Sequence, residues 1–186
     1  PAGVFASAAL APDLIIESLA LSPESPSLGN MVTFSVTVKN QGDIAAPASQ
    51  LVCYIDGASL DIASVESIDP GAVAARTFTW NAQSGPHIFR AAADSDNSFT
   101  ESNEANNDRT LAFTVLAPDL AIDAISRNPV NPSAGDSVNF TVRIINQGDK
   151  RAGVSHLDFY IDGSSRGYHT VLSIEAGASV NETYTW

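Results

Sequence analysis

The chain of 186 residues contains a single cysteine, Cys53. One cysteine has no partner for an intrachain disulfide, so a fold that depends on disulfides is excluded. Cys53 alternates with Leu51 and Ile55, as the inward-facing residues of a strand do, and the repeat described below aligns it with Phe159. We therefore predict that Cys53 is a small buried apolar residue and not a nucleophile.

Basic residues are also scarce, because 9 Lys and Arg stand against 21 Asp and Glu and give a net charge of −12. Only Lys39 and Lys150 are lysines. A chain this acidic repels nucleic acid and anionic membrane surfaces, so we exclude both as partners. The same charge attracts divalent cations.

Long apolar runs and common catalytic motifs are missing. No stretch reaches the roughly 18 apolar residues that a membrane helix needs, so no membrane insertion is expected. The chain starts at Pro1 without a methionine, which indicates a processed or cut piece, and Ala6-Ser-Ala8 is typical of a signal-peptidase site. We find no His-Glu-x-x-His, phosphate loop or Cys-x-x-Cys and expect no nucleophile elbow, so no catalytic residue is predicted and the chain is not expected to be an enzyme.

What the chain does contain is one alternating stretch used twice, at residues 32–43 and 138–149. In the first copy Val32, Phe34, Val36 and Val38 alternate with polar residues. A period of two is typical of a strand with one buried and one exposed face. Asn-Gln-Gly-Asp ends both copies, and we expect its glycine to supply positive φ in a turn.

This stretch belongs to a longer internal repeat. Residues 117–186 align without a gap on residues 11–80, at an offset of 106, and 32 of the 70 aligned pairs are identical. Tyr54-Ile-Asp-Gly57 aligns with Tyr160-Ile-Asp-Gly163, and Trp80 aligns with Trp186. The period is too long for a solenoid and suits a sandwich domain.

Seven strands and no helix are predicted within one repeat. The predicted strands cover residues 13–20, 31–39, 49–56, 59–66, 72–80, 87–94 and 110–116. Turn signals separate them, including Asp69-Pro-Gly71, where a type II turn would place Gly71 at positive φ. The pattern predicts an all-β chain of two tandem Ig-like, seven-stranded antiparallel β-sandwiches. The second lacks its last two strands, because Trp186 is the counterpart of Trp80.

Together these motifs carry a resemblance. Ala-Pro-Asp-Leu, Pro-x-x-Pro-x-x-Gly, the alternating strand into Asn-Gln-Gly, Tyr-x-Asp-Gly, Pro-Gly before Thr-Phe-Thr-Trp, Gly-x-His and the run 94–107 resemble the CARDB family. The resemblance covers 11–116 in full and 117–186 as far as the fifth strand. It implies Ig-like modules of bacterial and archaeal surface or secreted proteins that serve adhesion. It implies no catalytic residues.

The repeat also sets the expected domains, which are 11–116 and the incomplete 117–186. Residues 1–10 align with the end of the first repeat and resemble the last strand of a preceding domain. One explanation is that the chain is a segment of a longer array. The other is that this strand, through Val4, Ala6, Ala8 and Leu10, completes the open second domain of a neighbouring copy, head to tail.

The acidic run 94–108 is the candidate binding site. Asp94, Asp96, Asn97, Glu101 and Glu104 are the hard oxygen donors that Ca²⁺ takes, although their spacing is not that of an EF-hand. The alternative is a solvated hairpin loop whose side chains bond local backbone. No other cofactor is expected.

The sequence also contains N-glycosylation motifs, three histidines and recurring aromatic residues. Asn139 and Asn181 lie in N-glycosylation sequons. His87, His156 and His169 are expected at the surface or the edge of the core. The aromatic residues that recur in both halves are expected to pack in the core, the alternative being a platform for sugars.

These observations predict a non-enzymatic structural or adhesive repeat module, extracellular or on the cell surface, whose partners are other copies of itself or other surface proteins. We expect it to form part of a filament or array. The alternative is a carbohydrate- or protein-binding accessory module of a secreted hydrolase.

Overall fold

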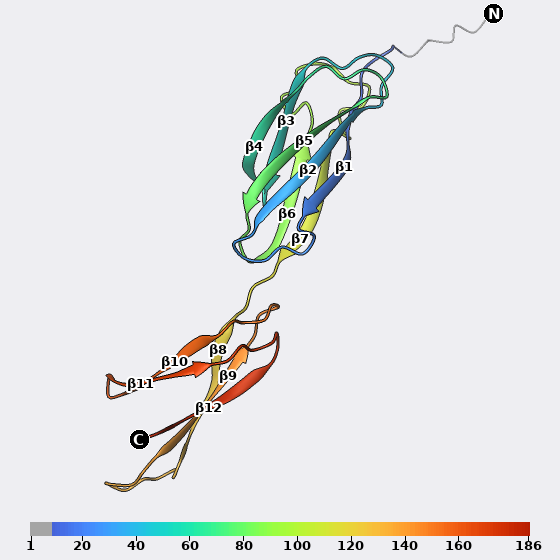
Figure 1. The fold of residues 1–186 in the computed structure, drawn as a ribbon. Helices are drawn as coiled ribbons and strands as arrows, with labels where there is room; N and C mark the ends of the chain where they lie inside the picture. The colour runs from blue at the N-terminus through green and yellow to red at the C-terminus, as the bar shows by residue number, and fades with distance from the viewer. Residues whose placement is uncertain (1–8) are drawn as a thin grey trace, which may run out of the picture. The chain divides into compact units, whose positions relative to one another are not determined.

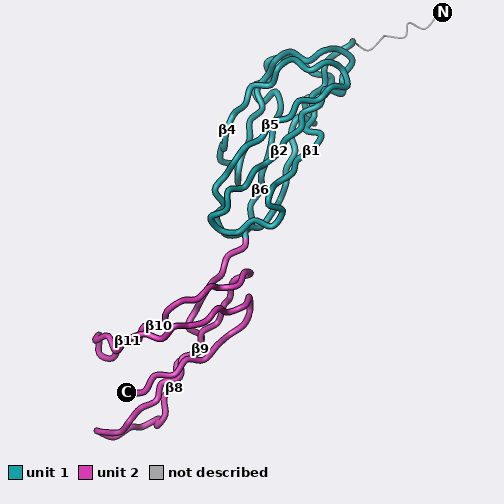
Figure 2. The backbone as a smooth tube through the Cα atoms, viewed as in Figure 1, with its two compact units in different colours: residues 1–115 teal, residues 116–186 magenta. Residues whose placement is uncertain are grey.

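The computed structural model describes residues 9–186, which form twelve strands and contain no helix (Figure 1). The chain divides into unit 1, which ends at Val115, and unit 2, which covers Leu116–Trp186 (Figure 2). Val4, Ala6 and Ala8 of the predicted donor strand lie outside the described residues, and Leu10 is exposed.

Unit 1 is a sandwich of two antiparallel sheets. Its three-stranded sheet has the order β1-β2-β5, and its four-stranded sheet has the order β4-β3-β6-β7. The strands are β1 Leu14–Ser22, β2 Met31–Asn40, β3 Ser49–Ile55, β4 Ala58–Val65, β5 Val73–Asn81, β6 Gly85–Ala92 and β7 Asp108–Val115. All seven predicted strands are present, with ends shifted by no more than a few residues.

Unit 2 repeats the first five strands of this plan. Its sheets have the orders β12-β9-β8 and β10-β11. The strands are β8 Leu120–Asn128, β9 Asn139–Asn146, β10 Ser155–Ile161, β11 Ser164–Val171 and β12 Ser179–Thr185. Within Leu116–Trp186 no strand takes the places of β6 and β7. The predicted fold class, including the incomplete second sandwich, is confirmed.

The core of unit 1 lies between its sheets and follows the period-two pattern. Val32, Phe34, Val36 and Val38 on β2 are all fully buried, as predicted. Phe34 stacks on Phe89 of β6, with ring centroids 4.0 Å apart and planes 2° apart. Burial of aromatic pairs in this arrangement is a large contribution to holding two sheets together.

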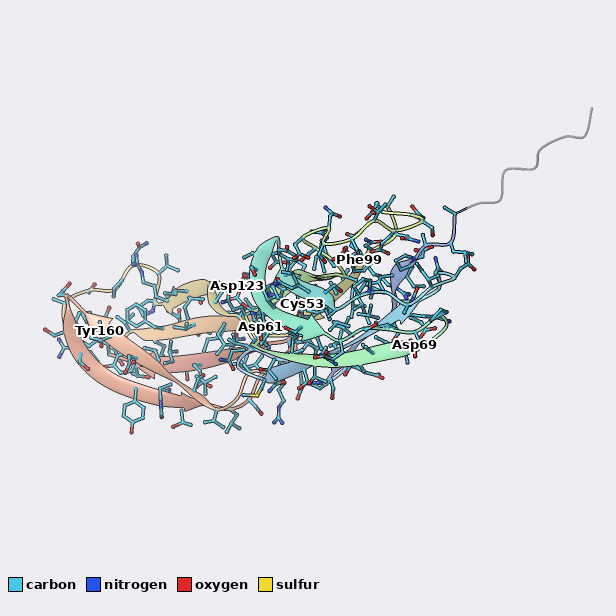
Figure 3. The ribbon with its side chains drawn as sticks, turned by 90° about the horizontal axis from the view of Figure 1, so that it is seen from above. Cys53, Asp61, Asp69, Phe99, Asp123 and Tyr160 are labelled. Atoms are coloured by element: carbon cyan, nitrogen blue, oxygen red, sulfur yellow. The ribbon has the colours of Figure 1, made fainter. Side chains whose placement is uncertain are left out.

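Cys53 is also fully buried, and it packs in the same core. Figure 3 labels Cys53 and Asp61, which face each other across the β3–β4 pair. Burial disfavours the thiolate and raises the pKa of Cys53 to about 12, with a further contribution from Asp61. The prediction that Cys53 is a buried core residue is confirmed.

The turns confirm one glycine prediction and correct another. Gly71 has φ of 77°, as expected for its turn. Gly42 of the Asn-Gln-Gly-Asp motif is not at positive φ, so that expectation was wrong. The glycine is required there by close approach, because a Cβ at Gly42 would lie 2.4 Å from the carbonyl oxygen of Ala11. Gly148 meets the same obstacle at Ala117.

Candidate functional site

The acidic run forms the loop between β6 and β7, and its side chains bond the loop itself. Asp94 is buried, and its Oδ1 accepts hydrogen bonds from the backbone N–H and the hydroxyl of Ser98, at 3.1 and 2.6 Å. Glu104 accepts a hydrogen bond from the Glu101 N–H at 2.8 Å. Phe99, labelled in Figure 3, packs against the core from the same loop. Short polar side chains commonly cap their own loop in this way.

Glu101 ties this loop to the start of β1. Its carboxylate is buried and accepts hydrogen bonds from the N–H of Leu14, at the start of β1, and from Nδ2 of Asn107. Burial raises the pKa of Glu101 to about 7 despite the bond from Leu14, and the charges of Glu104, Asp94 and Asp13 raise it further.

Asp13 is the residue of this network that the sequence analysis missed. Its carboxylate accepts hydrogen bonds from Asn106 Nδ2 at 2.9 Å, Gln41 Nε2 at 3.0 Å and Ser102 Oγ at 3.1 Å. The available signal was its recurrence as Asp119 in Ala-Pro-Asp-Leu, which marks a position the fold uses. The loop therefore closes one end of unit 1 over the start of β1.

The five predicted ligands are not gathered into one coordination shell. Asp96 and Asn97 are exposed, whereas Asp94 and Glu101 are buried and hydrogen-bonded. Within residues 9–186 no three His, Cys, Asp or Glu side chains are grouped so as to hold a metal ion. The bond from the Ser98 N–H to Asp94 is local, as in the hairpin-loop alternative, whereas Glu101 bonds the distant N–H of Leu14. Calcium stays a prediction.

Unit 2 exposes an apolar face whose equivalent in unit 1 is buried under that unit's own strands β6 and β7. A cavity of about 390 Å³ opens between its two sheets. It is lined mainly by Ile122, Ile125, Phe140, Val142, Phe159 and Tyr184. Ile122 is 50% exposed, whereas its counterpart Ile16 in unit 1 is 5% exposed. The difference arises because Phe89, Leu111 and Phe113 of β6 and β7 pack onto the core of unit 1.

His87 stands at the edge of the core of unit 1, where it was expected. Its Nδ1 lies 2.7 Å from Asp56 Oδ2, and its Nε2 lies 2.9 Å from the carbonyl oxygen of Gln83. Both partners accept hydrogen bonds, so both ring nitrogens can donate only from the imidazolium form. The bond from His87 also holds the pKa of Asp56 below its usual value. His156 is exposed and His169 partly so.

The aromatic prediction holds only in part. Phe78 is buried, but Tyr160 is 61% exposed, and so was wrongly expected in the core. Its counterpart Tyr54 is covered by Arg90 of β6, whose guanidinium carbon lies 5.2 Å from the ring centroid. Unit 2 has no described strand in the place of β6, so Tyr160 has no such cover.

One catalytic pattern escaped the sequence analysis. Gly163-Ser-Ser165-Arg-Gly167 has the spacing of a nucleophile elbow, but it lies on the β10–β11 hairpin rather than between a strand and a helix. The Ser165 hydroxyl accepts a long, 3.4 Å hydrogen bond from the Gly167 N–H. This geometry does not present an activated serine.

The two sequon asparagines are exposed on strands of unit 2. Asn139 begins β9, where its Oδ1 accepts a 2.6 Å hydrogen bond from the Thr185 hydroxyl, and Asn181 lies on β12. Exposure is what glycan attachment requires. Glycosylation itself stays a prediction.

The family model for CARDB matches residues 11–111 and again residues 117–186. The chain belongs to the CARDB family. The two matched segments coincide with the two sandwich units, so unit 1 and unit 2 are tandem CARDB domains. No curated protein matches the chain.

Solved CARDB structures agree with this assignment. A CARDB domain from Pyrococcus furiosus, solved in complex with di-metal ions, is 30% identical with a TM-score of 0.54 and aligns over 59% of this chain and 97% of its own. A domain from Methanosarcina acetivorans, whose name assigns the protein to the cell surface, is 25% identical with a TM-score of 0.50. That match covers 57% of this chain and 94% of the solved domain.

These structural relatives are domains, not known enzymes. Residues 9–186 include no helix with the length and apolar character that crossing a membrane requires.

Proposed function

We propose that this tandem CARDB chain is a non-enzymatic structural and adhesive module of an extracellular or cell-surface protein. The observation that carries the proposal is that the recurring buried polar residues of both units make hydrogen bonds that hold the fold together. Asn40 and Asn146 are buried and fully hydrogen-bonded, and the loop of Glu101 seals unit 1. The cell-surface name of one structural relative supports the location.

The proposed mode of assembly is strand addition from copy to copy. Within Leu116–Trp186 unit 2 has an exposed apolar face, and residues 1–10 resemble a last strand in sequence. Head-to-tail addition of this kind builds an open filament when the rotation between copies does not close. Its partner is a second copy of the chain.

Electron microscopy and sedimentation of the purified chain test this function. We expect concentration-dependent assembly by the full chain and no assembly after deletion of residues 1–10, with unit 1 folded in both. Assembly by the truncated chain would contradict strand addition. Turnover of an ester, glycoside or peptide substrate by the pure chain would contradict the non-enzymatic role.

The alternative is a carbohydrate-binding accessory module, and one observation favours it. A cavity of about 300 Å³ in unit 1 is lined by Trp80 together with Asp56, Ser59 and Gln83. An aromatic face beside hydrogen-bonding groups is chemistry that suits a sugar ring. A glycan array decides, because specific binding that Gln83→Ala removes would favour this function over assembly.

Calcium binding is a finer proposal for the acidic loop. The P. furiosus relative was solved with metal ions, and in this chain the buried Oδ1 atoms of Asn106 and Asn107 have no hydrogen-bond partner. Such oxygens are hard donors beside Asp13 and Glu101. Calcium should then raise the melting temperature of unit 1 relative to chelator. An unchanged midpoint at millimolar calcium removes this proposal.

A further inference from the structure

One histidine contacts three walls of the cavity of about 300 Å³ in unit 1. The side chain of His87 is only 10% exposed, and its ring meets that of Trp80 edge to face, with centroids 4.8 Å apart. Its two ring nitrogens lie 2.7 Å from Asp56 Oδ2 and 2.9 Å from the carbonyl oxygen of Gln83. Trp80, Asp56 and Gln83 all line the cavity, whereas His87 does not. The histidine therefore supports the site from outside it.

The three walls belong to different segments of unit 1. Asp56 lies in the turn between β3 and β4, and Trp80 lies near the end of β5. Gln83 lies in the connection from β5 to β6, and His87 is on β6 itself. The two hydrogen bonds of one imidazole ring thus help to set where the Gln83 wall lies relative to the Asp56 wall.

Both bonds form only when the ring is protonated. A carboxylate oxygen and a carbonyl oxygen are acceptors, and a neutral imidazole has a single N–H to offer. A neutral His87 would turn a lone pair toward one of its two partners, and burial makes such an unmet acceptor costly. Within the described chain the ring otherwise meets Trp80 of β5 and Phe113 of β7, so Asp56 is the one titratable side chain that faces it.

Asp56 supplies the negative charge that pairs with the imidazolium. Its Oδ1 accepts a hydrogen bond from the Ile88 N–H at 2.8 Å, and its Oδ2 faces His87. The hydrogen bond from His87, and then that from Ile88, hold the pKa of Asp56 below its usual value. Asp56 therefore stays ionised throughout the range in which histidine changes charge, about pH 5 to 8. Within that range the change of charge in the pair belongs to His87.

The cavity itself suits one uncharged sugar ring. Its lining joins the ring of Trp80 to the polar side chains of Asp56, Ser59 and Gln83. About 300 Å³ is at the lower end of the range for small-ligand sites, so one ring fits better than a chain of rings. Among the described residues that line it only Asp56 is charged, and a chain of net charge −12 repels anions, so an acidic sugar is disfavoured.

We propose that His87 is a positioning residue whose imidazolium form holds the walls of this cavity in place, so that the site binds an uncharged sugar ring at acid pH and loosens as His87 loses its proton. This inference rests on the carbohydrate-binding alternative above and adds its control by pH. The proton acts through Asp56 and Gln83 and does not touch the sugar. Affinity for the sugar therefore falls as the pH rises.

Hydrogen exchange tests the support without any ligand. The amides of Ala82 and Ile88 are hydrogen-bonded on the two sides of the Gln83 connection. Their protection, relative to the unstructured rate at each pH, should fall about fivefold or more between pH 5.5 and 8. His87→Gln, which does not titrate in this range, should remove that dependence, and His156→Gln, at an exposed position of unit 2, should keep it. An unchanged dependence in His87→Gln, or none in the unsubstituted chain, overturns the proposal.

Fluorescence measures binding in the Trp186→Phe chain, where Trp80 is the only tryptophan. The probes are methyl glucoside, methyl galactoside and methyl mannoside, each titrated at pH 5.5 and at pH 8. At least one should bind about fivefold or more tightly at the lower pH, and adding His87→Gln should abolish the difference. Binding that is equal at both pH values overturns the role of His87 but leaves carbohydrate binding standing. No binding of any probe at either pH overturns the carbohydrate site and this inference with it, but leaves the structural role standing.

Discussion

Asn40 and Asn146, which occupy the same position in the two repeats, make the same four side-chain hydrogen bonds. Oδ1 of Asn40 accepts from the N–H groups of Asp13 and Gly42, and its Nδ2 donates to the carbonyl oxygens of Ile44 and Ile68. The four partners of Asn146 are their counterparts. A buried carboxamide is thus fully satisfied twice, and each copy joins three separate segments of its unit.

Replacing Asn40 by Ala should destabilise unit 1 strongly. The change leaves buried backbone donors and acceptors without partners, at about 1–3 kcal/mol for each group that water cannot reach. We expect a loss of about 3 kcal/mol or more in urea unfolding of the full chain, followed by the fluorescence of Trp80. Asn81→Ala, at an exposed position at the end of β5, is the matched control and should change little. Equal stability of the two variants would show that the hydrogen bonds of Asn40 contribute little.

Gly42→Ala should cost more than Gly71→Ala. At Gly71 nothing lies within 4 Å of an added Cβ, so the cost is the strain of φ at 77°, about 1 kcal/mol. At Gly42 the added Cβ would collide with the backbone of Ala11 and Asp13, so the strand entry must move. Thermal melting of the two variants measures both costs. The reverse order of stability would contradict this account of the motif.

Unit 1 should gain stability from Glu101 as the pH falls. Its folded-state pKa of about 7 lies above the ordinary value of 4.5, because burial disfavours the carboxylate. The contribution of Glu101 is therefore fully present below about pH 4.5 and is lost as the pH rises through about 7. Glu101→Gln should flatten this part of the melting-temperature profile.

The control for that profile is Glu24→Gln, which removes an exposed carboxylate of the same unit. It should leave the dependence between pH 4.5 and 7 as it is in the unsubstituted chain. If Glu101→Gln and Glu24→Gln give the same profile, the buried carboxylate does not titrate in this range.

Cys53 should resist alkylation in the folded chain. Its thiol is fully buried and its pKa is about 12, so both access and thiolate population are suppressed. Iodoacetamide at pH 8 should label it only in denaturant, as seen by intact mass. Rapid labelling of the native chain would mean that unit 1 opens readily at β3.

The period-two pattern was enough to predict the strands of unit 1 and its buried face, because burial of alternate side chains is what that pattern records. It was not enough to predict the environment of Asp13 or Glu101, since their partners come from residues some 90 positions away. The recurrence of aromatic residues in both halves wrongly placed Tyr160 in the core. The position faces outward on its strand, and in unit 1 the neighbouring Arg90 covers the counterpart Tyr54.

The hydrogen bonds of Asn40 and Asn146 also bear on how the number of repeats in such a chain can change. Every group that Asn40 contacts lies between Asp13 and Ala72 of its own unit, and the same is true of Asn146 within its repeat. Among the described residues, all side-chain hydrogen-bond partners of each asparagine therefore belong to its own repeat. A gene duplication that copies one repeat therefore copies the asparagine together with all of its hydrogen-bond partners. The number of units can then change without substitutions at these positions.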